Sequence, residues 1–203
     1  LPFFLGPSRG ITQWLPEKLL ELRSRFSDLR VKVASCLMGG EGDGSSVLAS
    51  VLCSRIREVI DLDNLSRPHV ALVDHGTPVP EVSEVRETVA GLARALLGDE
   101  ISGIVTCCME RRPDPEYDFN DPLLQDLLLS DSIPEADTVV ALLFLAPGRH
   151  AGPGGDVDVI CRNAILEKPG VRIHLTRPMG EHDQLLDLLE KRLRECLDAD
   201  FLL

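Results

Sequence analysis

The sequence has no excess of positive charge, few aromatic residues and no long apolar run. Of its 203 residues, 33 are Asp or Glu and 21 are Lys or Arg, so the formal net charge is -12, and there is one Trp and one Tyr. Nucleic-acid binding needs a basic face that neutralises phosphates, so this charge balance argues against a nucleic-acid partner. No apolar run approaches the ~20 residues of a transmembrane helix, which argues against a membrane partner.

The cysteines indicate neither a disulfide framework nor a zinc ribbon. All six lie without C-x-x-C spacing, at Cys36, Cys53, Cys107, Cys108, Cys161 and Cys196. We therefore expect reduced, mostly buried thiols in a soluble cytoplasmic protein. The sequence also lacks the G-x-x-x-x-G-K-[ST] pattern and a G-x-G-x-x-G that follows a strand, which disfavours a nucleotide-binding enzyme.

Apolar strand-like runs alternate with helical patterns along the chain. This order is typical of βαβ units and predicts an α/β fold with a parallel sheet flanked by helices. Strands are expected at 1–5, 29–36, 70–74, 101–107, 138–145 and 171–175. Helices are expected at 13–26, 46–60, 80–97, 122–129, 156–166 and 183–197, with a seam at 61–68.

The two ends of the chain resemble each other. The run Leu5-Gly6-Pro7-Ser8-Arg9-Gly10 is similar to Leu145-Ala146-Pro147-Gly148-Arg149-His150, and 29–39 is similar to 171–180. The separation, about 140 residues, is that of a domain rather than of a solenoid repeat. We therefore expect a tandem repeat, in which residues 1–62 are the C-terminal half of a degenerate first domain and residues 69–203 are a complete second copy. Because Gly10 stands in the place of His150, the chemistry is expected in the second copy alone.

Two histidines stand where an apolar strand-like run gives way to a Gly/Pro loop. His75 follows residues 70–74 and precedes Gly76-Thr77-Pro78, and His150 lies in the Gly/Pro-rich segment 147–155. In an open α/β sheet, ligands bind beyond the carboxyl ends of the strands, so two such loops can meet at one pocket. A neutral imidazole there binds a divalent metal or accepts a proton near pH 7. For His75 the alternative is a histidine that only caps a turn.

Glu110 and several arginines follow or surround these loops. Glu110 closes the strand-like run 101–107, so its carboxylate is expected in the same crevice as a metal ligand or a base, unless it pairs with Arg111 or Arg112. Arginine suits bidentate recognition of carboxylates. We therefore predict a positive lip for a polycarboxylate ligand, formed by Arg111, Arg112, Arg149 and Arg162. The alternative is that these arginines form ordinary surface ion pairs.

Other residues with metal-binding side chains are interpreted as structural. Adjacent Cys107 and Cys108 would point to opposite faces of a strand, and Asp156 is placed to cap the helix that follows it. The acidic residues of the run 181–183 suit the beginning of a helix. His69 and His174 are interpreted in the same way.

Taken in order, these motifs resemble those of the CbiX/SirB type of sirohydrochlorin chelatases, class II chelatases built from one or two flavodoxin-like domains. The family pattern H-G-[ST] is matched at 75–77, and a strand that ends in Glu is matched loosely at 108–110. The pattern F-L-x-x-G-x-H…D-[IV] is matched at 144–150 and 156–157, with an extra Gly-Pro-Gly-Gly between the two parts.

The resemblance implies insertion of Co²⁺ or Fe²⁺ into sirohydrochlorin, for cobalamin or sirohaem synthesis, with no cofactor beyond the substrate metal ion. His75 and His150 would hold the ion, and Glu110 would complete the site or take a pyrrole proton. The tetrapyrrole would be bound by Thr77, Arg111, Arg112 and Arg149. The alternative function is a non-catalytic carrier of metal or tetrapyrrole. We also expect the exposed sheet edge of a half-domain to favour homodimerisation or aggregation.

Overall fold

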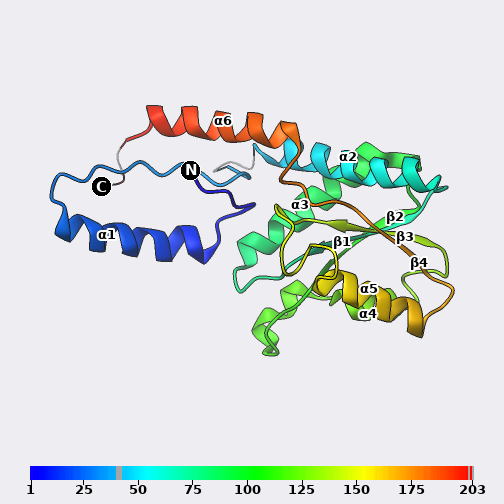
Figure 1. Cartoon of the computed structure of the whole chain (residues 1–203). Helices are drawn as coiled ribbons and strands as arrows, with labels where there is room; N and C mark the ends of the chain where they lie inside the picture. The colour runs from blue at the N-terminus through cyan, green and yellow to red at the C-terminus, as the bar shows by residue number, and fades with distance from the viewer. Residues whose placement is uncertain (40–42, 201, 203) are drawn as a thin grey trace.

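A computed structural model describes residues 1–39, 43–200 and 202, and a parallel four-stranded sheet lies at its centre (Figure 1). Its strands, in the spatial order β2-β1-β3-β4, are β1 (His69–Asp74), β2 (Gly103–Cys108), β3 (Asp137–Leu142) and β4 (Arg172–Leu175). The predicted α/β fold is thereby confirmed. The connections leave β1 and β3 in opposite directions along the sheet, so the loops after these two strands flank a topological switch point.

Helices cover both faces of the sheet. On one face lie α2 (Ser45–Asp63) and α3 (Pro80–Leu97), and on the other lie α4 (Leu124–Leu129) and α5 (Asp156–Glu167) (Figure 1). Short 3-10 helices, η2 and η3, occupy Gly98–Glu100 and Pro115–Asn120. Within the described residues, no helix is both long and apolar enough to cross a membrane.

The sheet separates two hydrophobic cores, because successive residues of a strand point to opposite faces. In β1, Val70 and Leu72 belong to the core that α2 and α3 close, whereas Ala71 and Val73 belong to the core beneath α4 and α5. All four side chains are fully buried. A continuous apolar strand of this kind is typical of parallel sheets that are covered on both faces.

The last helix, α6 (Asp183–Asp198), leads away from the sheet towards the N-terminal segment, where η1 (Gly10–Trp14), a π-helix, and α1 (Leu15–Arg25) lie (Figure 1). Arg192 of α6 has only 2% of its side chain exposed. It donates hydrogen bonds to the carbonyl oxygens of Cys36 and Leu37, at 3.1 and 3.0 Å, and to both carboxylate oxygens of Asp43 at 2.9 Å. This buried guanidinium ties α6 to the chain that precedes α2.

Two strands expected in the N-terminal segment do not form. Backbone hydrogen bonds of 2.9 Å join the N–H of Leu37 to the carbonyl of Phe4, and that of Met38 to the carbonyl of Leu5. A strand needs a continuing ladder, and in the described part of the chain the segments 1–5 and 29–36 have no further strand beside them. These two expectations were therefore wrong. The other expected elements are confirmed, with ends that differ by a few residues.

The assignment of residues 1–62 to a degenerate first domain stays a prediction. Within that range, α2 shares one hydrophobic core with α3, β1 and β3 rather than standing apart from the second unit. Leu48, Leu52 and Ile56 of α2 are fully buried in this core. Residues 45–63 are therefore part of the body that carries the sheet.

The cysteines behave as expected. All six are free, and five are buried. Cys107 and Cys108 have no exposed surface, and burial raises the pKa of the Cys108 thiol to about 11. Burial also raises the pKa of Cys161 to about 12. Such thiols stay protonated near neutral pH, which fits a structural role.

Candidate active site

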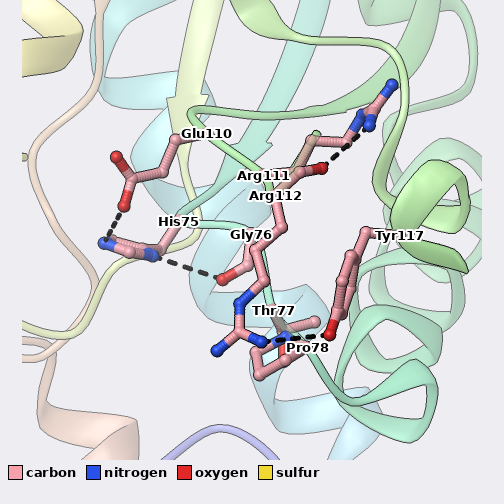
Figure 2. A pocket seen from close by; sticks show the side chains of 8 residues that line it. All are labelled: His75, Gly76, Thr77, Pro78, Glu110, Arg111, Arg112 and Tyr117. Carbon is pink, nitrogen blue, oxygen red and sulfur yellow. Dashed lines mark hydrogen bonds and ion pairs between the residues drawn. The ribbon is translucent and has the colours of Figure 1, made fainter. Parts of the chain in front are cut away.

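His75 follows β1 at the carboxyl edge of the sheet. Its Nδ1 atom lies 3.2 Å from the carbonyl oxygen of Gly76. A carbonyl only accepts, so this contact is a hydrogen bond that Nδ1 donates. Nε2 faces the carboxylate of Glu110, with 3.4 Å between Nε2 and Oε1 (Figure 2). The His75 side chain is 47% exposed, so Nε2 is accessible to an incoming ligand.

Glycine at position 76 allows the loops after β1 and β2 to approach closely. Gly76 has a φ of +92°, and a Cβ atom there would lie 1.8 Å from the carbonyl oxygen of Glu110. The same loops are joined by backbone hydrogen bonds from Met109 N to Asp74 O at 2.8 Å and from Glu110 N to His75 O at 3.2 Å. The backbone therefore sets Glu110 beside His75.

Asn120, at the end of η3, is hydrogen bonded to the loop that follows β1 and has no exposed surface. Its Oδ1 accepts a hydrogen bond from the Thr77 N–H at 2.9 Å, and its Nδ2 donates to the carbonyl oxygens of Thr77 at 3.0 Å and Tyr117 at 2.9 Å. The Thr77 hydroxyl accepts from the Val79 N–H at 3.1 Å. Both polar groups of the Thr77 backbone are thus fixed by one buried side chain.

A buried ion pair supports the same loop. Asp74 accepts hydrogen bonds from the Gly76 N–H and from Arg86, both at 3.1 Å, and Arg86 also donates to the Asn120 carbonyl at 3.2 Å. The Arg86 side chain is only 1% exposed. Burial raises the pKa of Asp74, although the adjacent Arg86 opposes this shift. Sequence reasoning missed this network, and the one available signal was an acidic residue at the end of an otherwise apolar strand.

His150 lies in the loop between β3 and α5, and its ring sits edge-on to the ring of His75. The ring centroids are 4.7 Å apart and the planes are inclined by 79°. Nδ1 of His150 lies 2.6 Å from Oδ2 of Asp156. A carboxylate that accepts the Nδ1 proton fixes the tautomer and leaves the lone pair on Nε2. This arrangement is common among metal-binding histidines. The two predicted histidines therefore converge, with Nε2 of His75 facing the Glu110 carboxylate.

Asp156 does not cap α5 as expected. The N-cap position is taken by Gly155, and Asp156 is the first residue of the helix. A Cβ atom on Gly155 would lie 2.6 Å from the carbonyl of Arg149 and 2.8 Å from that of His150, so the loop folds closely around this glycine. This compact turn brings the Asp156 carboxylate to His150. From the residues alone Asp156 was interpreted as a helix cap, although the family pattern that the sequence resembles also includes it at 156–157.

His75, His150 and Glu110 are not arranged as three ligands around one metal position. Among the residues that the structure describes, no group of three or more His, Cys, Asp or Glu side chains could hold a metal ion as placed. His75 contacts both Glu110 and His150, so the donors stand as two pairs that share His75. The Glu110 side chain is 62% exposed, so most of it is surrounded by solvent rather than by protein.

A cavity of about 310 Å³ opens beside His75 (Figure 2) and is lined by His75, Gly76, Thr77, Pro78, Glu110, Arg111, Arg112 and Tyr117. Arg112 reaches across it, where it donates to the Tyr117 hydroxyl at 3.0 Å and lies 5.3 Å from the centroid of that ring. Its guanidinium thus faces the cavity with most of its donors unused.

For Arg111, which was predicted to belong to a positive lip or else to a surface ion pair, the structure shows ion pairs. Arg111 binds both carboxylate oxygens of Asp121, at 2.5 and 3.0 Å, and lies 3.2 Å from Asp118. The bond to Asp121 raises the pKa of Arg111. The alternative prediction, a pair between Glu110 and Arg111 or Arg112, was wrong, since Glu110 faces His75. Arg111 is therefore neutralised within its own loop, because Asp118 of η3 and Asp121, directly after η3, both lie against it.

The other two arginines lie outside the lining of this cavity. Arg149 is 84% exposed, with 4.0 Å between its Nε and the Asp156 carboxylate. Arg162 pairs with Asp158 one turn earlier on α5, at 2.8 Å. Only Arg149 of these two is left available to a ligand near His150.

Two of the remaining histidines, His174 and His182, form contacts within the fold, and His69 is the first residue of β1. His174 lies between two carboxylates, 2.6 Å from Asp63 and 3.2 Å from Asp137. The Nδ1 atom of His182 accepts from the Gln184 N–H at 3.3 Å and caps α6.

The CbiX family model matches residues 69–196, more than half of the chain. The chain belongs to the CbiX family. The matched CbiX region contains His75, Glu110 and His150. The chloroplastic sirohydrochlorin ferrochelatase of Arabidopsis thaliana is 37% identical over 67 residues, which are 30% of this chain and 29% of that protein. The match therefore spans less than a third of that relative.

Solved structures share the fold of this CbiX-family chain. The sirohydrochlorin chelatase SirB from Bacillus subtilis subspecies spizizenii, in complex with cobalt, aligns with a TM-score of 0.66 at 16% identity over 96% of this chain and 67% of its own. SirB from Bacillus subtilis with Fe³⁺ aligns with a TM-score of 0.70 at 16% identity, over 97% and 70%. CbiX, the terminal enzyme of siroheme biosynthesis in denitrifying bacteria, aligns with a TM-score of 0.64 at 15% identity, over 97% and 74%. At these identities the likeness shows the fold.

Proposed function

We propose that this chain is a metal chelatase that inserts Co²⁺ or Fe²⁺ into sirohydrochlorin or a similar polycarboxylate tetrapyrrole. One observation carries the proposal: His75 and His150 meet with ring centroids 4.7 Å apart, each with Nδ1 engaged, and Nε2 of His75 faces the exposed carboxylate of Glu110 at 3.4 Å. Membership in the CbiX family supports it, as do the activities for which the related ferrochelatase and SirB are named.

The residues present suit both parts of the reaction. Metal insertion replaces the inner N–H protons of the macrocycle, so the site must present the ion and accept protons. Neutral imidazoles bind the substrate metal through Nε2. Glu110 lies beside them as the carboxylate that accepts a pyrrole proton and passes it to water. Its 62% exposure and the 47% exposure of His75 favour release of both the ion and the proton.

The tetrapyrrole is proposed to lie over the cavity beside His75, with its carboxylates held by cations at the rim. Arg112 on one side and Arg149 on the other have guanidinium donors to spare, and the Thr77 hydroxyl keeps a proton to donate. Arg111 is reassigned to the support of its own loop, because its donors are taken by Asp121, Asp118 and the Arg112 carbonyl. A local positive rim then attracts an acidic ligand to an acidic protein.

Anaerobic absorbance spectroscopy of sirohydrochlorin with Co²⁺ or Fe²⁺ tests the proposal. We expect metal-dependent spectral conversion faster than the uncatalysed rate, and loss of it in His75→Ala and His150→Ala. His182→Ser is the matched control, because serine retains the cap of α6. Which metal reacts faster decides between cobalt and iron. Spectral shifts without conversion would support the carrier function instead, and no response would contradict both.

We propose further that the chain works in the cytoplasm and self-associates. Free cysteines fit a reducing compartment. On α1, where no residue is buried, Leu20 is 57% exposed, and the flanking Trp14 and Phe26 are 59% and 56% exposed, which favours association of two copies. Light scattering across a concentration series tests this, and a monomer at every concentration would contradict it.

A further inference from the structure

A second cavity lies next to the one beside His75, across Pro78. Its volume is about 450 Å³. Two segments that are distant in the sequence line it: Pro7, Arg9, Thr12 and Gln13 from the N-terminal segment, and Pro78, Val79, Pro80 and Glu81 from the start of α3. Because Pro78 lines both cavities, a flat ligand that covers this proline extends from His75 to the N-terminal segment.

Arg9 brings an uncommitted cation to this second cavity. Its side chain is exposed and, within the described residues, forms no hydrogen bond or ion pair. The hydroxyl of Thr12 is instead used within the segment, where it donates to the Ser8 carbonyl at 3.1 Å. Glu81 adds one carboxylate to the lining and is not paired with Arg9. An anionic group that enters here therefore meets a guanidinium whose donors are all available.

The internal repeat relates Arg9 to Arg149. The two arginines occupy the same place in the similar runs 5–10 and 145–150. In both runs the residue before the repeated leucine accepts a backbone hydrogen bond from the second similar segment: Phe4 accepts from Leu37 N–H at 2.9 Å and Phe144 from Met179 N–H at 2.8 Å, with the donor shifted by one position, since Met38 is the residue that matches Met179. The first run has Gly10 where the second has His150. It therefore presents an arginine without a metal-binding imidazole.

We propose that Arg9 and the cavity around it form a subsite for a peripheral carboxylate of the ligand whose centre faces His75. The identity of that ligand, a polycarboxylate tetrapyrrole, rests on the proposed function. A guanidinium binds a carboxylate through two parallel hydrogen bonds, which fixes the orientation of a flat ligand as well as holding it. The N-terminal segment then contributes to substrate binding, whereas residues 69–196 hold the metal.

Fluorescence titration of metal-free sirohydrochlorin into the whole chain at low ionic strength tests the subsite. We expect Arg9→Ala to raise Kd roughly 5- to 20-fold, between the effect of an exposed ion pair and that of a charge-assisted hydrogen bond. Arg9→Glu should raise Kd further, and Glu81→Gln should lower it. Added salt should shrink the difference between Arg9→Ala and the unmodified chain, since exposed charges are screened.

Arg23→Ala is the matched control, because Arg23 is an exposed arginine of α1 that lines neither cavity. Its Kd for sirohydrochlorin should stay unchanged, and Arg9→Ala should leave Co²⁺ affinity unchanged. Equal Kd values for Arg9→Ala and the unmodified chain, or an equal loss in Arg23→Ala, would overturn the subsite. So would an unmodified chain that binds no sirohydrochlorin.

The same titration in the His75→Ala background separates this inference from the proposed function. An Arg9-dependent Kd should persist there, because no metal is involved. Binding that depends on Arg9 in a chain that inserts no metal would overturn the chelatase function and support the subsite. Metal insertion with a Kd that is indifferent to Arg9 would do the reverse.

Discussion

The Asp156 carboxylate is hydrogen bonded to Nδ1 of His150 at 2.6 Å, and this bond sets which nitrogen of the ring is left for a ligand. Without it, the two ring nitrogens compete for the proton, and the imidazole rotates more freely. In the proposed function, Asp156 would therefore act on the substrate metal through His150.

We expect Asp156→Asn to weaken Co²⁺ binding by roughly 10- to 100-fold, as is usual when the carboxylate partner of a metal-binding histidine is lost. Titration of Co²⁺ followed by absorbance measures the affinity. Glu167→Gln, at the exposed end of the same helix, is the control and should bind as the unmodified chain does. An unchanged affinity in Asp156→Asn would show that the bond does not orient His150.

Asn120→Ala should destabilise the protein by about 1–3 kcal/mol, because the buried polar groups of Thr77 and Tyr117 lose their partners. The rate of metal insertion should fall as well, since the loop that carries His75 is loosened. Urea unfolding and the anaerobic absorbance assay measure the two effects. Asn163→Ala, at an exposed position of α5, should change stability by less than about 0.5 kcal/mol. Equal stabilities of the two variants would contradict this account.

Gly76→Ala and Gly91→Ala should shift stability in opposite directions. A Cβ atom at Gly76 meets the Glu110 carbonyl oxygen at 1.8 Å, at a φ of +92°, so this variant should lose at least about 1–3 kcal/mol. At Gly91, in the middle of α3, a Cβ atom meets nothing within 4 Å, and alanine should add roughly 0.5–1 kcal/mol. Thermal unfolding by circular dichroism compares them, and a harmless Gly76→Ala would refute the close approach of the two loops.

Substitutions of Arg111 and Arg112 should have different effects, the first on stability and the second on ligand affinity. Arg111→Ala, Asp121→Asn and the double variant should cost similar stability, because the two side chains act as one pair. Arg112→Ala should instead raise the Kd for sirohydrochlorin, by roughly 5-fold or more, with little change in stability. If Arg111→Ala weakens sirohydrochlorin binding as strongly as Arg112→Ala, the reassignment of Arg111 is wrong.

Stability should depend on pH through Asp137. Arg172 and, to a smaller extent, His174 lower the pKa of Asp137 to about 2. A carboxyl whose folded pKa lies below its unfolded value of about 3.9 stabilises the fold above the unfolded pKa, and this contribution is lost as the pH falls towards the folded pKa. The difference in unfolding free energy between the unmodified chain and Asp137→Asn should therefore be largest above about pH 5 and decline towards pH 2.

Urea unfolding at a series of pH values measures that difference. Asp126→Asn is the control, because Asp126 is exposed on α4 and forms no ion pair among the described side chains. Its difference from the unmodified chain should stay small throughout. A constant gap for Asp137→Asn would mean that the ion pair with Arg172 does not contribute.

The rule that ligands bind beyond the carboxyl ends of parallel strands correctly places the two histidines and Glu110 together. It works because parallel strands end at one edge of the sheet, so residues that follow β1, β2 and β3 must meet there. The rule fails for Arg111, since a sequence does not show that η3 turns back and brings Asp118 and Asp121 to it. It also misses Asn120 and Asp74, which support the loop after β1 through buried hydrogen bonds between residues that are distant in the sequence.

The sequence by itself determined the order of strands and helices from residue 69 onwards, because alternating apolar patterns are local and each element buries its own face. It also determined where His75 and His150 would stand. Tertiary structure alone decided that the segments 1–5 and 29–36 are not strands, since an apolar run becomes a strand only where a neighbouring segment completes the ladder of hydrogen bonds. It likewise decided which charges are paired: Arg111 forms ion pairs, whereas Arg9 forms none with any residue that the structure describes, although the two side chains carry the same charge.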